Sequence, residues 1–100
     1  MMRKTPHPVM QHLVEIIGKY LLTVTSPLIT YPEKAQLRVA YAKEQNLLRF
    51  RLVVEPEDIS LLIGRNGMTA SAIRSLAKAA GEKHGVRVVV RILSSDEVEQ

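Results

Sequence analysis

Apolar side chains recur every three or four residues near the start of the chain, which is the spacing of one helix face. This pattern predicts an amphipathic helix over residues 8–24, with Pro8 at the first position, where a missing N–H costs no hydrogen bond. The positions that form the apolar face are Val9, Leu13, Ile16, Ile17, Tyr20, Leu21 and Val24. Residues 26–34, which hold two prolines, are expected to form a loop.

Residues 36–42 and 47–54 alternate between apolar and polar positions, the period of a half-buried β-strand. The apolar positions are Leu37, Val39 and Tyr41 in the first stretch and Leu48, Phe50, Leu52 and Val54 in the second. Four polar residues, 43–46, separate the two stretches. The pattern therefore predicts an antiparallel hairpin.

The second half of the chain predicts two more helices and a third strand. A short helix is expected over 56–63, because a proline and two acidic residues at its start suit a helix N-terminus. A longer helix is expected over 68–84 and an alternating strand over 86–93, while the acidic tail of 94–100 is expected to be disordered. The inner face of the longer helix is expected to hold Ile73, Leu76, Ala77 and Ala80.

The order of elements over residues 8–93 is therefore α-β-β-α-α-β, in a single domain of the α+β class. Each predicted strand has one apolar and one polar face, so the three helices are expected to cover one face of a three-stranded sheet.

Charge adds a hint about partners. The formal net charge is +4, but the tail contributes three carboxylates and no base, so residues 1–93 carry +7. A basic domain favours polyanionic partners such as nucleic acid. No apolar run reaches the roughly 18 residues of a membrane span, and the basic N-terminus lacks a signal-peptide cleavage site, so we expect a cytoplasmic protein without membrane association.

The sequence predicts no catalytic or metal site, no cofactor and no small-molecule substrate. It contains no cysteine, which excludes disulfides and thiolate metal ligands. His7, His12 and His84 lack the spacing of metal ligands. Glu55, Glu57 and Asp58 are explained as helix-start carboxylates rather than as an acid–base set.

One motif carries chemistry: Gly64-Arg65-Asn66-Gly67, between two predicted helices. The glycines allow a tight turn and let a phosphate backbone approach with no Cβ in the way. Arg65 adds a charged donor, and Asn66 tolerates left-handed dihedral angles. The helix that begins at Met68 offers free N–H groups and the positive end of its dipole to an anion.

Residues 56–59, 63–67, 69–70 and 72–76, together with 13–15 in the first helix, resemble the small stand-alone KH proteins of bacteria. The resemblance implies a type II KH domain with a mixed three-stranded sheet. It implies cytoplasmic binding of single-stranded RNA without catalysis, in the role of an RNA chaperone or post-transcriptional regulator. It also suggests a homodimer, or a pairing with a larger KH-containing protein.

In the KH module, the GxxG loop clamps the backbone of about four nucleotides while the bases lie over an adjacent apolar groove. The residues expected to contact RNA are Ile63, Gly64, Arg65, Asn66, Gly67, Met68, Thr69, Arg74 and Lys78. The chain departs from the family at Ser60 and Leu61, where a glycine and a basic residue are usual, and at Met68, where a basic residue is common. Leu61 and Met68 are expected to be exposed, as a base-packing surface, a protein interface or scattered surface residues.

Other interpretations remain open. The GxxG segment could be a plain turn in a protein-interaction module, or it could clamp single-stranded DNA. Arg74 and Lys78 could simply be solvated. Five arginines are expected on the uncovered face of the sheet, where solvation, edge protection or a partner interface explains them better than RNA. They are Arg38, Arg49, Arg51, Arg87 and Arg91.

Overall fold

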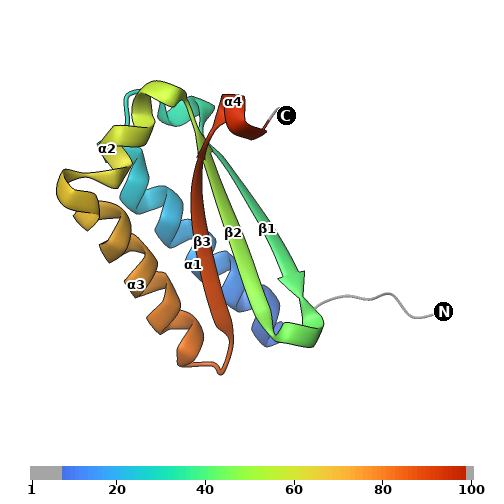
Figure 1. The fold of residues 1–100 in the computed structure, drawn as a ribbon. Coiled ribbons are helices and arrows are strands. Elements are labelled where there is room, and N and C mark those ends of the chain that lie inside the picture. Colours follow the sequence, from blue (N-terminus) through green and yellow to red (C-terminus); the bar gives the residue numbers. More distant parts are fainter. Residues whose placement is uncertain (1–7, 99–100) are drawn as a thin grey trace.

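The computed structural model describes residues 8–98, which form a three-stranded sheet with helices packed against it (Figure 1). The strands are β1 (Gln36–Ala42), β2 (Leu47–Val54) and β3 (Arg87–Ser94), in the order β1-β2-β3. β1 pairs with β2 in the antiparallel sense, whereas β2 and β3 are parallel. The parallel pair exists because the chain crosses over through two helices between β2 and β3.

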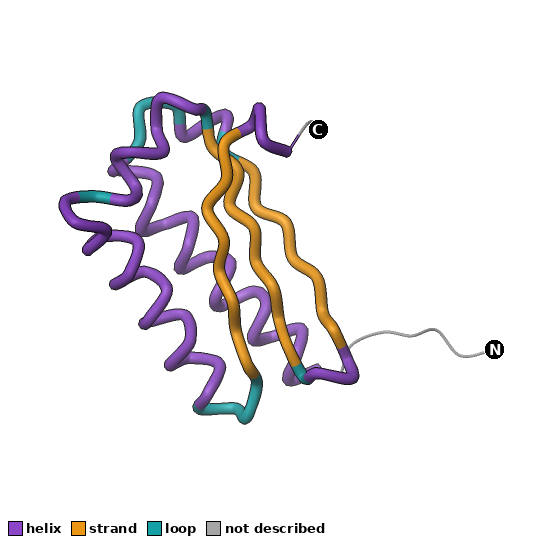
Figure 2. The backbone as a smooth tube through the Cα atoms, in the orientation of Figure 1, coloured by secondary structure: helices purple, strands orange, loops and turns teal. Residues whose placement is uncertain are grey.

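Three helices lie on one face of this sheet: α1 (Pro8–Thr25), α2 (Ile59–Ile63) and α3 (Met68–Glu82) (Figures 1 and 2). The predicted α+β class, with a mixed sheet and its helices on one face, is confirmed. The core lies between α1, α3 and the helix-facing side of β2 and β3. Its buried members from these elements include Leu13, Ile17, Leu21, Leu48, Phe50, Ile73, Ala77, Val88 and Val90.

The boundaries of the elements differ from the sequence-based ones by small shifts. Both strands of the hairpin begin and end at the predicted residues. The predicted helix over 56–63 divides into a 3₁₀ turn (Pro56–Asp58) and α2. α3 ends at Glu82, two residues early, and β3 is displaced by one residue. The predicted loop over 26–34 contains two 3₁₀ turns, Ser26–Leu28 and Pro32–Lys34.

Several apolar residues that the pattern predicts for the core are exposed. Leu76 on α3 is 60% exposed, Ile16 on α1 is 46% exposed, and Val39 and Tyr41 on β1 are also exposed. Val39 and Tyr41 line an open hollow of about 570 Å³ beside Met10 and Val14, because α1 does not close over the edge strand β1. In α2, only Leu62 is buried. Ile63, one of the expected RNA contacts, is 42% exposed because a single turn presents only one side to the sheet.

The acidic tail also differs from the prediction. Ser95–Val98 form a short helix, α4, where disorder was expected over 94–100; residues 99 and 100 lie outside the described residues. The Glu97 carboxylate accepts a hydrogen bond from the Ser94 N–H at 2.7 Å, and the Ser94 hydroxyl donates to Asp96 and Glu97. The bond from the Ser94 N–H to Glu97 is the glutamate half of a capping box, in which the residue three positions later satisfies the N–H of the residue before the helix.

Asp58 fastens the α1–β1 connection to the start of α2. It is fully buried, and its two carboxylate oxygens accept hydrogen bonds from the backbone N–H groups of Thr30 and Tyr31, at 2.8 and 3.0 Å. Burial alone would raise the pKa of the Asp58 carboxyl, but these hydrogen bonds and one from the Thr30 hydroxyl hold it below its ordinary value. The carboxylate therefore holds a loop in place and makes no side-chain cap on α2.

Candidate nucleic-acid interface

The backbone between α2 and α3 turns through three residues with positive φ. Gly64 has φ 74° and ψ −179°, Asn66 has φ 56°, and Gly67 has φ 73°. The Gly67 N–H donates to the Gly64 carbonyl at 3.2 Å and closes the turn. Asn66 adopts the left-handed conformation that the sequence analysis considered tolerable for it. Such a conformation costs about 1–2 kcal/mol for most L-residues, but asparagine visits it readily.

The two glycines of the motif are required for different reasons. The dihedral angles of Gly64 fall in a region that is essentially reserved for glycine, and a Cβ there would also collide with the Thr69 side chain. At Gly67, a Cβ would meet nothing within 4 Å. Gly64 thus fixes the shape of the turn, while Gly67 leaves open space beside its backbone.

This open turn leads directly into α3. Gly67 is the N-cap residue, and no side chain of the described residues forms a cap hydrogen bond there. The Met68 N–H donates to the Arg65 carbonyl, and the next N–H groups of α3 have no side-chain acceptor at the end where the helix dipole is positive. Arg65 is exposed within the turn. Donors, dipole and cation together make this segment suited to an anion.

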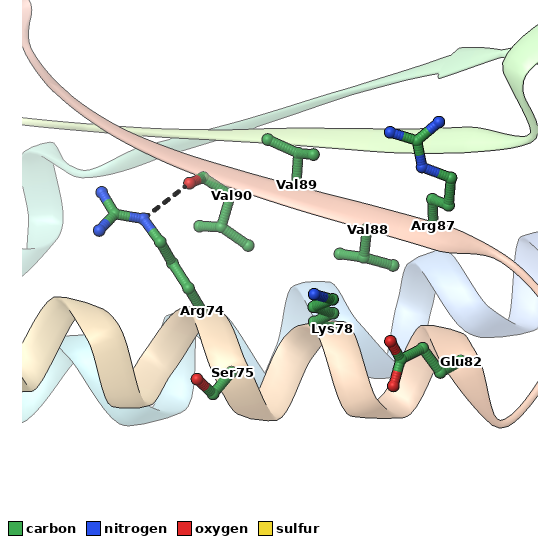
Figure 3. Close-up of a pocket in the computed structure, with 8 residues that line it drawn as sticks. All are labelled: Arg74, Ser75, Lys78, Glu82, Arg87, Val88, Val89 and Val90. Atoms are coloured by element: carbon green, nitrogen blue, oxygen red, sulfur yellow. Dashed lines mark hydrogen bonds between the residues drawn. The ribbon is translucent and has the colours of Figure 1, made fainter.

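A groove of about 470 Å³ runs between α3 and β3 (Figure 3). α3 contributes Arg74, Ser75, Lys78 and Glu82, and β3 contributes Arg87, Val88, Val89 and Val90. Arg74, the lining residue nearest the loop, lies six residues after Met68, or about 9 Å along the helix. The structure thus aligns the turn and the predicted cations Arg74 and Lys78 along one helix.

Arg74 reaches across this groove. Its Nε donates a hydrogen bond to the Val90 carbonyl oxygen at 3.1 Å. Figure 3 shows Val88 and Val90 directed toward α3, with Val89 and Arg87 on the other side of the strand. The groove therefore combines valine side chains with the cations of α3.

The outer edge of β3 adds backbone groups to the same groove. The Arg87 N–H donates to the Asn46 carbonyl at the start of β2, at 3.0 Å. Because alternate residues of a strand direct their backbone groups to opposite sides, those of Val88 and Val90 face away from β2. The hydrogen bond from Arg74 to Val90 uses one of these outward carbonyls. The others can pair with the polar edge of a ligand.

Met68 and Thr69 lie apart from this groove, although the sequence analysis placed them with Arg74 and Lys78. They line a separate hollow of about 340 Å³ between α1 and α3, together with Tyr20, Val24, Ala72, Ile73 and Leu76. Met68 is 66% exposed there. Burial raises the pKa of the Tyr20 hydroxyl, which donates to the Ile73 carbonyl at 3.2 Å and joins the two helices. We call this hollow the α1–α3 surface.

Sequence reasoning did not find Ser75, Glu82 or the β3 valines as groove residues. Nothing in their local pattern distinguishes them from ordinary surface and core positions, since the groove forms only where α3 lies beside β3. Among residues 8–98, no group of three His, Asp or Glu side chains could hold a metal ion. None of the described helices is long and apolar enough to cross a membrane.

Comparison with known proteins settles the family. The family model described as "KhpA/KhpB, KH domain" matches residues 18–92. The chain belongs to the KhpA/KhpB KH-domain family. This membership confirms the resemblance to small bacterial KH proteins that residues 56–76 carry.

Several relatives in the KhpA/KhpB family are named RNA-binding protein KhpA. The one from Clostridium perfringens is 37% identical over 84 residues, covering 84% of this chain and 100% of the relative. That from Lactiplantibacillus plantarum is 41% identical over 60 residues, which cover 60% of this chain and 68% of the relative. That from Caldanaerobacter subterraneus is 31% identical over 77 residues, covering 77% of this chain and all of the relative.

A solved structure shares the fold. In the crystal structure of an Aquifex aeolicus Era variant bound to GDP and aluminium fluoride, the match has a TM-score of 0.52 at 17% identity. It covers 90% of this chain but only 32% of the Era chain. The similarity concerns the fold of a KH-sized part of that longer protein.

Proposed function

We propose that the chain is a non-catalytic protein that binds single-stranded RNA, with the segment from Gly64 to Gly67 holding the phosphate backbone. The observation that carries the proposal is the position of this turn. It leads into an α3 N-terminus without a side-chain cap and precedes a groove lined by Arg74 and Lys78. The names of the KhpA relatives support RNA as the ligand and binding as the activity.

In this proposal, phosphates lie against the turn and bases lie along the α3–β3 groove. Arg65 and the N–H groups of α3 that follow Met68 contact the phosphates, and Arg65 forms the stronger hydrogen bonds because it is charged. The outward backbone groups of β3 receive the bases, and the buried side chains of Val88 and Val90 form the wall behind them. No aromatic residue lines this groove, so stacking contributes little and sequence selectivity is expected to be low. A cytoplasmic location and a role as RNA chaperone or post-transcriptional regulator belong to the same proposal.

The test is fluorescence anisotropy with short labelled single-stranded RNAs at two salt concentrations. The variant is Arg65→Asp with Asn66→Asp, which repels phosphate while aspartate still tolerates the positive φ of position 66. The matched control is Lys43→Asp with Gln45→Asp, which makes the same change in charge on the exposed β1–β2 turn at the other end of the sheet. Matched DNA oligonucleotides test single-stranded DNA as the ligand.

Loss of salt-dependent binding in the loop variant, with binding retained by the control, is the expected result. Equal weakening in both variants would show a general effect of net charge. Binding that is unchanged in the loop variant would mean that the segment is a plain turn, as in a protein-interaction module.

A second proposal concerns a protein partner. The α1–α3 surface exposes Met68 and Leu76 beside the phosphate-binding turn. Exposed apolar groups gathered in one hollow are typical of protein–protein contacts. The family description names two proteins, KhpA and KhpB. We propose that this surface joins the chain to a second copy or to a larger KH-containing protein, which would raise RNA affinity through avidity.

A further inference from the structure

The face of the sheet opposite α1, α2 and α3 carries five arginines. Along β2, Leu48, Phe50 and Leu52 point toward the helices and are buried, so the residues between them point to the other face. The strand register extends this assignment to β1 and β3. We call this surface the arginine face, formed by Arg38, Arg49, Arg51, Arg87 and Arg91.

The register places three of these arginines in one row. Arg38 on β1 pairs with Arg51 on β2, and Arg51 pairs with Arg91 on β3. Because neighbouring strands lie about 4.8 Å apart, the row spans about 10 Å between its outer Cα atoms. Arg49 lies two positions before Arg51, on the same face. Arg38, Arg49 and Arg51 together line a hollow of about 220 Å³.

This positive charge is not compensated within residues 8–98. None of the five guanidinium groups lies within 4.0 Å of a carboxylate of those residues. Arg38 donates to the Gln36 side-chain oxygen at 3.2 Å, and that acceptor is neutral. Like charges directly opposite each other in a sheet are destabilising. The arrangement therefore reduces the stability of the fold and calls for another explanation.

Edge protection accounts for only part of this arrangement. Charged side chains prevent aggregation when they lie on edge strands, and the edges of this sheet are β1 and β3. Arg49 and Arg51 belong to β2, which is paired on both sides. α4 contacts β2 and β3 at the far end of this face, where Val53 is only 5% exposed. The α4 carboxylates of Asp96 and Glu97 bond to Ser94 and form no ion pair with the arginines.

We propose that the arginine face is a second RNA-contact surface, which binds phosphate groups without sequence selectivity. The inference rests on the proposed function, because it takes RNA as the ligand. The planar guanidinium group matches phosphate and can bind it through two parallel hydrogen bonds. A protein partner would need a large apolar or aromatic anchor, whereas the residues paired with Arg49 are Ala40 and Val89. High positive charge with few anchors is characteristic of nucleic-acid interfaces.

Arg87 connects this face with the α3–β3 groove. It lines the groove, yet its side chain lies on the opposite side of β3 from Val88 and Val90 (Figure 3). An RNA that leaves the groove at this end can pass around the outer edge of β3 and reach Arg91 and Arg51. Only an RNA longer than the segment held at the loop would use both surfaces.

The experiment measures the anisotropy of labelled single-stranded RNAs of about 5 and about 20 nucleotides, since the KH clamp itself holds about four. The variant replaces the row with Arg38→Gln, Arg51→Gln and Arg91→Gln. The control, Lys19→Gln, Lys43→Gln and Lys83→Gln, removes the same charge from exposed positions outside the arginine face. Thermal unfolding checks the fold, and the row variant should be at least as stable as the parent because repulsion is relieved.

We expect the row variant to bind the short RNA like the control and the long RNA several-fold more weakly. The salt slope for the long RNA should fall by about 2, since each phosphate contact on a single strand contributes about 0.7. Equal binding of the long RNA by row variant and control would overturn the inference about the arginine face. The proposed binding of RNA at the α3–β3 groove would be unaffected. A parent that binds neither RNA would defeat the proposed function as well. If labelled polyglutamate bound the parent more tightly than the row variant, while the long RNA bound both alike, the face would be assigned to an acidic protein instead.

Discussion

Arg74 on α3 donates a hydrogen bond from Nε to the carbonyl oxygen of Val90 on β3, at 3.1 Å (Figure 3). One cation of the proposed RNA site is thereby held across the groove instead of extending freely into solvent. The bond uses one nitrogen of the guanidinium group, and the two Nη atoms stay available for a phosphate. Arg74 therefore joins α3 to β3 and, in the proposed function, also presents its charge to a phosphate.

The first prediction concerns this residue. Arg74→Ala should weaken RNA binding and lower the salt slope by about 0.7, which is one phosphate contact. Arg74→Lys should keep the salt slope because the charge remains, with weaker binding because the planar fork is lost. Anisotropy titrations over several salt concentrations measure both quantities. An unchanged salt slope in Arg74→Ala would mean that Arg74 makes no phosphate contact and contributes only its hydrogen bond to Val90.

The two glycines of the turn should respond differently to alanine. Gly67→Ala should reduce the free energy of unfolding by about 1–2 kcal/mol, the cost of a left-handed alanine with space around it. Gly64→Ala should cost more, because its backbone region alone costs about 1–3 kcal/mol and the new Cβ also meets Thr69. Urea unfolding of both variants decides the order. Equal losses would show that Thr69 moves aside.

Asp58 should make the stability depend on pH. Because the folded-state pKa of Asp58 lies below its unfolded value, ionised Asp58 stabilises the fold above about pH 4, and this contribution disappears as pH falls through the lowered pKa. Asp58→Asn should therefore melt below the parent at pH 7, with a difference that narrows at acidic pH. The exposed neighbour provides the control, as Glu57→Gln should lower the melting temperature at pH 7 less than Asp58→Asn does. A constant difference for Asp58→Asn would contradict the assignment.

The α1–α3 surface should control assembly. Leu76→Asp places a charge in this hollow without touching the α3–β3 groove, so it should shift the protein toward monomer in sedimentation while the short-RNA affinity per site is kept. Val39→Asp is the matched control, since Val39 is an exposed apolar residue on the edge strand β1. A strict monomer in the parent, together with no binding to a second KH protein, would rule out this surface as an interface.

The turn chemistry was predictable because it is local. The pair of glycines with Asn66 between them specifies positive φ whatever packs around the loop, and the structure has positive φ at all three residues. The α4 helix was equally local. Ser94 followed by Glu97 is a capping-box signature in the sequence, whereas the prediction of disorder rested on the acidic composition of the tail.

The sequence by itself determined the order of elements, the hairpin and the position of the glycine turn, because hydrophobic period and turn chemistry act within a few residues of each other. Only the tertiary structure decided which partners those elements meet. Leu76 has a core-like pattern but faces outward, Met68 turns toward α1, and the groove exists because α3 lies beside β3. The row of Arg38, Arg51 and Arg91 depends on strand register, which joins residues up to 53 positions apart and leaves no trace in local spacing.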